Sequence, residues 1–221
     1  MNITAANAPE VAGAGATAAL SSSEASSFGA PDGSILGTNP QTAKPALAHA
    51  LKAVPVGPET APCTGGGTVT LSGDLANLTT LTAGDTLTFD FDACVQEGDT
   101  VDGTVSLTID AFEGDLAGGL YNLETSTTYS SLTVQSGDDS ASIDGDVSVD
   151  IDTRNAPTIL SVVSGQSLTL DVNTRSLTLT GFSTTTTLDE SMAPVGYTVD
   201  SSGSVASTEF DGTVSYESVI P

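Results

Sequence analysis

From about residue 68 onward, hydrophobic and polar residues alternate, and this period of two constrains the fold more than any other feature of the chain. In "DTLTFDFDA", Leu87, Phe89 and Phe91 alternate with Thr and Asp residues. The segments "GTVSLTIDAF" and "DGDVSVDID" repeat the pattern. Because successive side chains of a strand point to opposite faces, each segment predicts a strand with one apolar face and one hydrated, acidic face.

The alternation predicts about ten strands, joined by short connections rich in Gly, Asp, Asn and Ser. Short connections make consecutive strands antiparallel neighbours. So many strands with one apolar face must curl or pack to bury it. We expect a mainly β fold, a curled meander or up-and-down barrel, with a two-sheet β-sandwich as the alternative. The predicted strands are approximately 67–75, 85–93, 103–112, 121–135, 140–152, 157–164, 167–173, 176–189, 195–200 and 205–218.

Residues 1–62 are rich in Ala, Pro and Ser, and predict an N-terminal segment that precedes a β domain at 63–221. Two short helices are expected, at roughly 4–19 and in "AKPALAHALKAVP", covering or plugging one end of the β domain. In the second helix, Leu47, Leu51 and Val54 form one apolar stripe. Because so short a helix is unstable alone, this stripe should dock on the β domain of its own chain or of a neighbour.

The two cysteines, Cys63 and Cys94, predict one disulfide and an oxidising compartment. If 67–75 and 84–92 form a hairpin, paired residue numbers sum to about 159. Cys63 then lies opposite a position close to Cys94. The bridge would tie the open end of the hairpin.

The dipeptide Gly-Asp recurs between Gly73 and Asp146 at spacings of 11, 14, 16, 23 and 8 residues. A calcium-binding β-roll needs a fixed nonapeptide period, so these spacings favour turn chemistry instead. The loop "EGDTVDG" is a weak candidate for calcium, through Glu97, Asp99 and Asp102. It lacks the length and order of an EF-hand loop, so we expect a solvated acidic hairpin without a bound metal.

The remaining features exclude several functional classes. A net charge of −24, from 28 acidic and four basic residues, opposes nucleic-acid binding. The chain contains no run of about 18 apolar residues, so the sequence predicts no membrane-spanning helix. The single histidine, His49, is not accompanied by a G-x-S-x-G motif, and no phosphate-binding loop is present. We therefore expect neither catalysis nor a cofactor.

A cluster of motifs lies between Cys63 and Asp110: a Cys-Thr-Gly-Gly-Gly start, a Thr-x-Gly-Asp-Thr turn, a second Cys, and an acid-Gly turn before an alternating strand. In these features the chain resembles a group of uncharacterised exported, β-rich, envelope or lipoprotein-like proteins of proteobacteria. The resemblance implies a β-rich fold and a location in the periplasm, on the outer-membrane surface or outside the cell. It implies no activity.

Two functional hypotheses follow. The first is a non-catalytic structural or interaction protein of the envelope or cell surface, which self-assembles with other copies through a sheet edge or an exchanged N-terminal segment. The alternative is a carrier that holds an apolar small molecule inside a curled sheet, with the 45–54 helix as a lid. An acid/base hydrolase is the weakest interpretation, since 28 acids will pair by chance.

Overall fold

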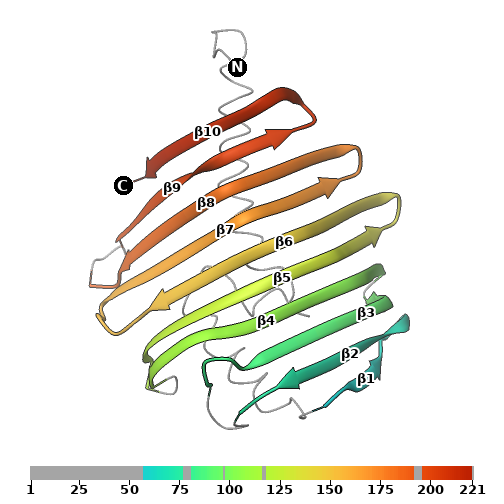
Figure 1. The fold of residues 1–221 in the computed structure, drawn as a ribbon, viewed down its shortest axis with the longest axis horizontal. Coiled ribbons are helices and arrows are strands. Elements are labelled where there is room, and N and C mark those ends of the chain that lie inside the picture. Colours follow the sequence, from blue (N-terminus) through green and yellow to red (C-terminus); the bar gives the residue numbers. More distant parts are fainter. Residues whose placement is uncertain (1–56, 77–80, 97, 116–117, 192–195, 221) are drawn as a thin grey trace.

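The computed structural model describes residues 57–76, 81–96, 98–115, 118–191 and 196–220. They form a single sheet of ten strands, in which each strand is antiparallel to the strands next to it in the sequence (Figure 1). The strands are β1 (Glu59–Pro62), β2 (Gly66–Asp74), β3 (Thr86–Gln96), β4 (Asp99–Asp115), β5 (Leu120–Ser136), β6 (Asp139–Asp152), β7 (Thr158–Val172), β8 (Arg175–Asp189), β9 (Gly196–Ser207) and β10 (Phe210–Ile220).

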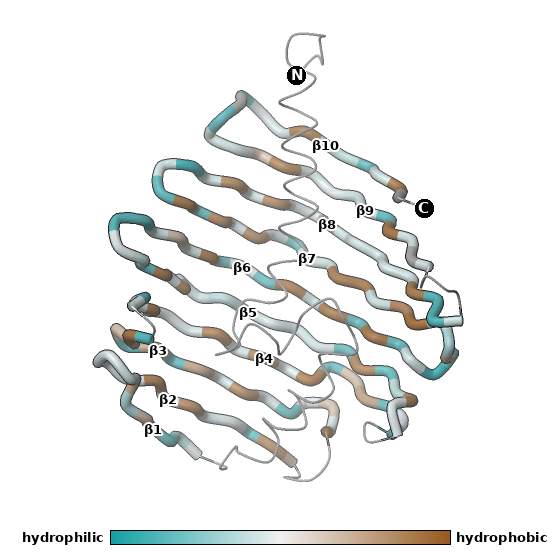
Figure 2. The backbone as a smooth tube through the Cα atoms, turned by 180° about the vertical axis from the view of Figure 1, so that it is seen from behind, coloured by the Kyte–Doolittle hydropathy of each residue, from teal (hydrophilic) through white to brown (hydrophobic). Residues whose placement is uncertain are grey.

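The strands form where Val, Ile, Leu and Thr alternate with polar residues, and Figure 2 shows hydrophobic and hydrophilic positions succeeding each other along each strand. Tight turns join them where Gly or Asn supplies a positive φ, as at Gly137 and Asn173. Sequential hairpins then give the meander, since each short turn returns the chain beside the strand it has just left. The mainly β, antiparallel prediction is confirmed.

The sheet is open, so the barrel prediction is wrong on closure. Among the described residues, β1 and β10 form the two edges and do not pair with each other. A two-sheet sandwich is not found either, because all ten strands belong to the same sheet. Short connections specify which strands are neighbours, whereas closure depends on whether the first and last strands meet, and local sequence does not encode this.

Three predicted strands need correction. The segments 157–164 and 167–173 are one continuous strand, β7, which runs through Gly165. The chain turns at 208–209, so the predicted strand 205–218 is divided between β9 and β10. The short β1 was not predicted, and it lies within the range assigned to the N-terminal segment. Both predicted helices lie outside the described residues.

A line of β-bulges crosses the sheet from β3 to β9. Pairing shifts register after Phe91, Asp102, Tyr129, Gly145 and Thr180 in five pairs of strands, whereas β7 and β8 pair without a shift. Each shift adds a residue, so the spacing of inward-facing side chains slips from two to three, as between Tyr129 and Leu132. The bulges therefore preserve one apolar face across strands whose sequence alternation is locally interrupted.

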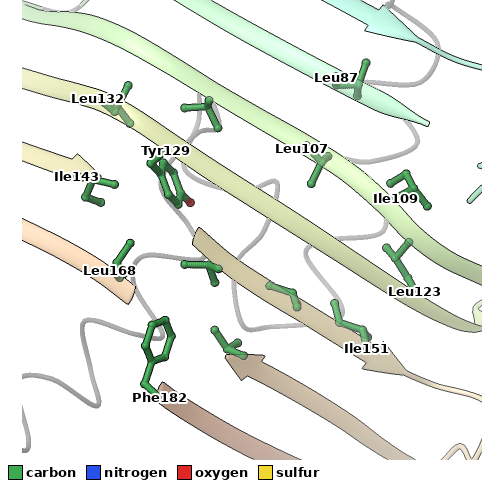
Figure 3. Packing of buried hydrophobic residues seen from close by; sticks show 14 of the residues in the cluster. Leu87, Leu107, Ile109, Leu123, Tyr129, Leu132, Ile143, Ile151, Leu168 and Phe182 are labelled. Atoms are coloured by element: carbon green, nitrogen blue, oxygen red, sulfur yellow. The ribbon is translucent and has the colours of Figure 1, made fainter. Parts of the chain in front are cut away.

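The hydrophobic core lies on one face of the sheet, called the apolar face below; the opposite face is called the polar face. Figure 3 shows labelled members of this core, among them Leu107, Ile109, Leu123 and Ile151 of neighbouring strands. The most deeply buried side chains include Tyr121, Tyr129, Phe182, Leu168, Leu179, Val147 and Val205. Two rows of directly paired side chains, which cross neighbouring strands on this face, define the candidate site.

Candidate functional site

Two threonines occupy the middle of the apolar face, on the central strand β5. Thr125 pairs with Ile109 on β4 and with Val149 on β6. Thr127 pairs with Leu107 and Val147 in the same way. Directly paired side chains have Cβ atoms about 4.5–5.5 Å apart. Each threonine is therefore flanked on both sides by aliphatic side chains.

Both hydroxyl groups are buried and unsatisfied. Thr125 is 2% exposed and Thr127 is 1% exposed. Within the described part of the chain, neither Oγ1 atom has a hydrogen-bond partner. An unsatisfied buried hydroxyl costs about 1–3 kcal/mol, and valine would fill nearly the same volume without that cost. The pair is thus an unfavourable choice for a core that only has to be filled.

Two groups of buried hydroxyls on the same face are satisfied, whereas the buried Tyr216 hydroxyl, like those of Thr125 and Thr127, has no partner in the described chain. In the row of Thr125, three and four strands further along, Thr184 Oγ1 on β8 and Ser201 Oγ on β9 are 3.1 Å apart and hydrogen-bonded. Near the end of β6, Thr153 Oγ1 accepts from the Tyr121 amide at 2.9 Å and lies 2.8 Å from the Gly119 carbonyl oxygen. The sheet can therefore provide partners for buried hydroxyls, and does not do so at Thr125 and Thr127.

The described part of the chain has few positive charges. The basic residues in the described ranges are Arg154 and Arg175, and both pair with carboxylates. Arg154 donates to Asp152 and Glu113, and its hydrogen bonds to Asp152 lower the pKa of that carboxyl group. A negatively charged ligand would find no free cation among these described side chains.

Carboxylates of the polar face are held by neighbouring hydroxyl and amide groups. Thr104 Oγ1 donates to Asp90 at 3.1 Å, and Asn122 Nδ2 donates to Asp150 at 2.7 Å. Ser142 Oγ likewise donates to Asp171 at 3.2 Å. In each of these three pairs, the acid lies beside a Ser, Thr or Asn side chain of the neighbouring strand.

The two edges of the sheet differ in length and in protection. β1 has four residues and ends at Pro62, which cannot donate a backbone hydrogen bond. β10 has 11 residues, with neither Pro nor Lys between Phe210 and Ile220. Val219 of β10 is 69% exposed. Among the described strands, β10 pairs only with β9, so its outer backbone groups have no strand partner within the described sheet.

The structure contains the predicted Cys63–Cys94 disulfide, with Cα atoms 5.4 Å apart. Leu71 pairs with Phe89, which places the β2–β3 register one residue from the predicted one. Cys63 lies in the tight turn between β1 and β2, where its amide donates to the Gly67 carbonyl at 3.1 Å, and this turn brings it beside Cys94. The bridge ties the turn before β2 to the end of β3.

The Gly-Asp pairs have more than one structural role. Gly84, Gly98 and Gly137 lie in turns, as predicted, whereas Gly145 lies at a bulge inside β6. In the weak calcium candidate, Asp99 begins β4 and Asp102 Oδ2 accepts a hydrogen bond from the Ala93 amide at 3.1 Å. Glu97 lies outside the described residues. The described residues contain no cluster of three or more potential metal ligands.

The predicted docking residues Leu47, Leu51 and Val54 also lie outside the described residues. Thr125 and Thr127 were not among the predicted site residues. The sequence signal for them is the phase of "LETSTTY", which places two threonines where the alternation calls for hydrophobic residues. In the described ranges, no helix is long and apolar enough to cross a bilayer.

Comparison with known proteins identified no relative: no family model, no curated protein and no solved structure matches this chain.

Proposed function

We propose that this protein is a non-catalytic structural or interaction module of the cell envelope or surface, which assembles by pairing β10 with β10 of a second copy. The observation that carries the proposal is the unequal protection of the two edges. An unpaired strand of 11 residues is a template for further pairing. The short β1 ending in Pro62 is a poor one.

Export is part of this proposal. It is supported by the disulfide, which persists in oxidising compartments. A non-catalytic role is supported by the described carboxylates of the polar face, whose hydrogen bonds to Ser, Thr and Asn side chains serve the sheet itself.

The test is sedimentation velocity over a range of protein and salt concentrations. The chain should self-associate, and more strongly at high salt, because screening reduces the repulsion between copies of net charge −24. Val219→Lys should prevent association by placing a charge on the edge strand. Val172→Lys is the matched control, since Val172 is also exposed, at 52%, but ends the interior strand β7.

The proposal fails if the unaltered chain is monomeric at high salt and high concentration. It also fails if Val219→Lys and Val172→Lys weaken association equally, because the effect would then come from charge rather than from the edge.

A second candidate function, a carrier of an apolar small molecule, is favoured by one observation. The aliphatic centre of the apolar face contains two buried hydroxyls that lack partners within the described chain. Ligand sites are typically apolar surfaces with a few convergent polar groups. Saturable binding of an apolar probe to the full chain tests this function.

A further inference from the structure

We infer that residues 1–56 of the same chain form a second layer over the apolar face, so that this face is an intramolecular docking surface. The inference concerns a face of the sheet rather than its edge, and it goes beyond the assembly through β10 proposed above.

Thr127 and Thr128 show that one face of the sheet is covered and the other is not. They are identical side chains at adjacent positions of β5, so they point to opposite faces. Each has directly paired neighbours on both β4 and β6. Yet Thr127 is 1% exposed, whereas Thr128 is an exposed residue. Because strands of the sheet flank both threonines, the difference requires a further layer over the apolar face.

This covered surface extends over several strands. Leu168 on β7, Leu179 on β8 and Val205 on β9 are all 0% exposed. The described strands cannot supply the cover, because they form one open sheet in which each strand lies beside its sequence neighbours (Figure 1). The second layer therefore comes from residues outside the described ranges.

Length and position along the chain identify the segment. The other stretches outside the described ranges have at most four consecutive residues: 77–80, 97, 116–117, 192–195 and 221. Residues 1–56 lead into β1, so they start from one edge of the sheet. Crossing from β1 to β10 takes about 43 Å. A chain of 56 residues spans about 84 Å even when wholly helical, so it can reach every strand.

The segment is also large enough to cover the core. A residue on one face of a sheet occupies roughly 33 Å², from a strand spacing of about 4.8 Å and a two-residue repeat of about 6.8 Å. The 20 buried residues of the described core cluster then occupy roughly 650 Å². A helix about 84 Å long and about 10 Å wide covers roughly 840 Å². One copy of residues 1–56 therefore suffices.

Composition and charge favour this segment over a second copy. Residues 1–56 contain 15 alanines and the apolar stripe of Leu47, Leu51 and Val54. With three acidic residues and two lysines their net charge is −1, whereas residues 57–221, with 25 acidic and two basic residues, carry −23. A nearly neutral layer adds little repulsion, while a second copy brings a net charge of −24. The exposures above are those of one chain by itself, so the cover belongs to that chain.

Photo-crosslinking of the full chain tests the inference. Photo-leucine has nearly the size of leucine and carries a diazirine that reacts with groups in direct contact. Leu168 and Leu160 lie on the same strand, but Leu160 is 37% exposed on the polar face. Photo-leucine at Leu168 should crosslink to peptides from residues 1–56, and at Leu160, the matched control, these crosslinks should be lost. Leu179, paired with Leu168, is a second test position if the first label prevents folding.

Isotope labelling distinguishes the chain's own segment from that of a second copy. Unlabelled and nitrogen-15-labelled chains are mixed while unfolded in urea and refolded together. Crosslinked peptides should then carry one isotope only, because segment and sheet belong to the same chain. Peptide pairs that combine both isotopes would show that the segment covers a neighbouring copy, and would overturn the inference.

Two further results would contradict the inference. One is the absence of crosslinks to residues 1–56 from both Leu168 and Leu179. The other is equally frequent crosslinking from Leu160, which would mean that the segment does not distinguish the two faces. Assembly through β10 is measured separately by sedimentation, so its failure and the failure of this inference are distinguishable.

Discussion

Tyr129 on β5 pairs directly with Gly145 on β6, so one of the largest buried side chains lies opposite a residue without a side chain. Gly145 has φ +127° and marks the β6 bulge. A Cβ atom there would overlap the carbonyl oxygen of Ser167 and lie 2.9 Å from Cα of Leu168. The bulge thus depends on a glycine at this position.

Gly145→Ala should lower the free energy of unfolding by about 2–3 kcal/mol, through backbone strain and the clash with β7. Urea unfolding measures the loss. Gly137→Ala is the control, because Gly137 also has positive φ but no atom within 4 Å of an added Cβ. It should cost only about 1 kcal/mol. Equal losses for the two variants would contradict the importance of close contact at the bulge.

Reduction of the disulfide should destabilise the fold. The bridge joins residues 31 positions apart, and closing such a loop is worth roughly 3–4 kcal/mol in the chain-entropy model. Urea unfolding with and without reductant measures this difference. A Cys63→Ser, Cys94→Ser double variant should match the reduced chain and show no response to reductant. Two free thiols in the unfolded, unreduced protein would show that the bridge does not form.

Thr153 and Thr125 should respond oppositely to replacement by valine. Thr153 Oγ1 accepts from the Tyr121 amide and reaches the Gly119 carbonyl, so Thr153→Val should cost about 1–3 kcal/mol. Thr125→Val removes a hydroxyl with no partner in the described chain and should cost nothing or stabilise. Urea unfolding of both variants checks the contrast. A comparable loss at Thr125 would mean that its hydroxyl is satisfied in solution.

The contribution of Asp152 to stability should disappear in acid. Hydrogen bonds from the Arg154 side chain and amide lower the pKa of Asp152 below its usual value. A carboxylate with a lowered folded-state pKa stabilises the fold above its unfolded pKa of about 3.9, and this contribution falls as pH drops through the folded value. Asp152→Asn should therefore be less stable than the unaltered chain at pH 6, and the difference should vanish in strong acid.

Arg154→Gln removes the cause of that shift and provides the reciprocal check. In this background, Asp152→Asn should produce a much smaller difference at pH 6. Unfolding curves recorded across the acid range measure both effects. A difference between Asp152→Asn and the unaltered chain that does not change with pH would exclude the linkage.

The strands were predictable because each carries its own alternation, as in Leu87, Phe89 and Phe91 on β3. The interruption at Gly165 was misinterpreted as a strand end, although the pairing of Gly165 with Phe182 continues β7 through it. Whether the sheet closes depends on contacts between its most distant strands, and no local pattern records them. Local sequence therefore specified strands and neighbours better than global shape.

The hydroxyl pair could not be predicted for a different reason. Threonine is common in strands, so Thr125 and Thr127 resemble the many threonines of the polar face. Alternation along β5 places them on the same face as Leu123 and Tyr129. Whether a buried hydroxyl has a hydrogen-bond partner, however, depends on the neighbouring strands. The disulfide was predictable because the chain has only two cysteines, although the β1–β2 turn that brings Cys63 beside Cys94 was not predicted.

The difference in length and protection between β1 and β10 also limits how far an assembly can grow. If two copies join through β10, the same surface is used on both, and the pairing is related by a two-fold axis. The outer boundaries of the merged sheet are then two copies of β1, each four residues long and ending at Pro62. Neither boundary can recruit a third copy effectively, so addition stops at the dimer, where a head-to-tail arrangement would have propagated into a fibre.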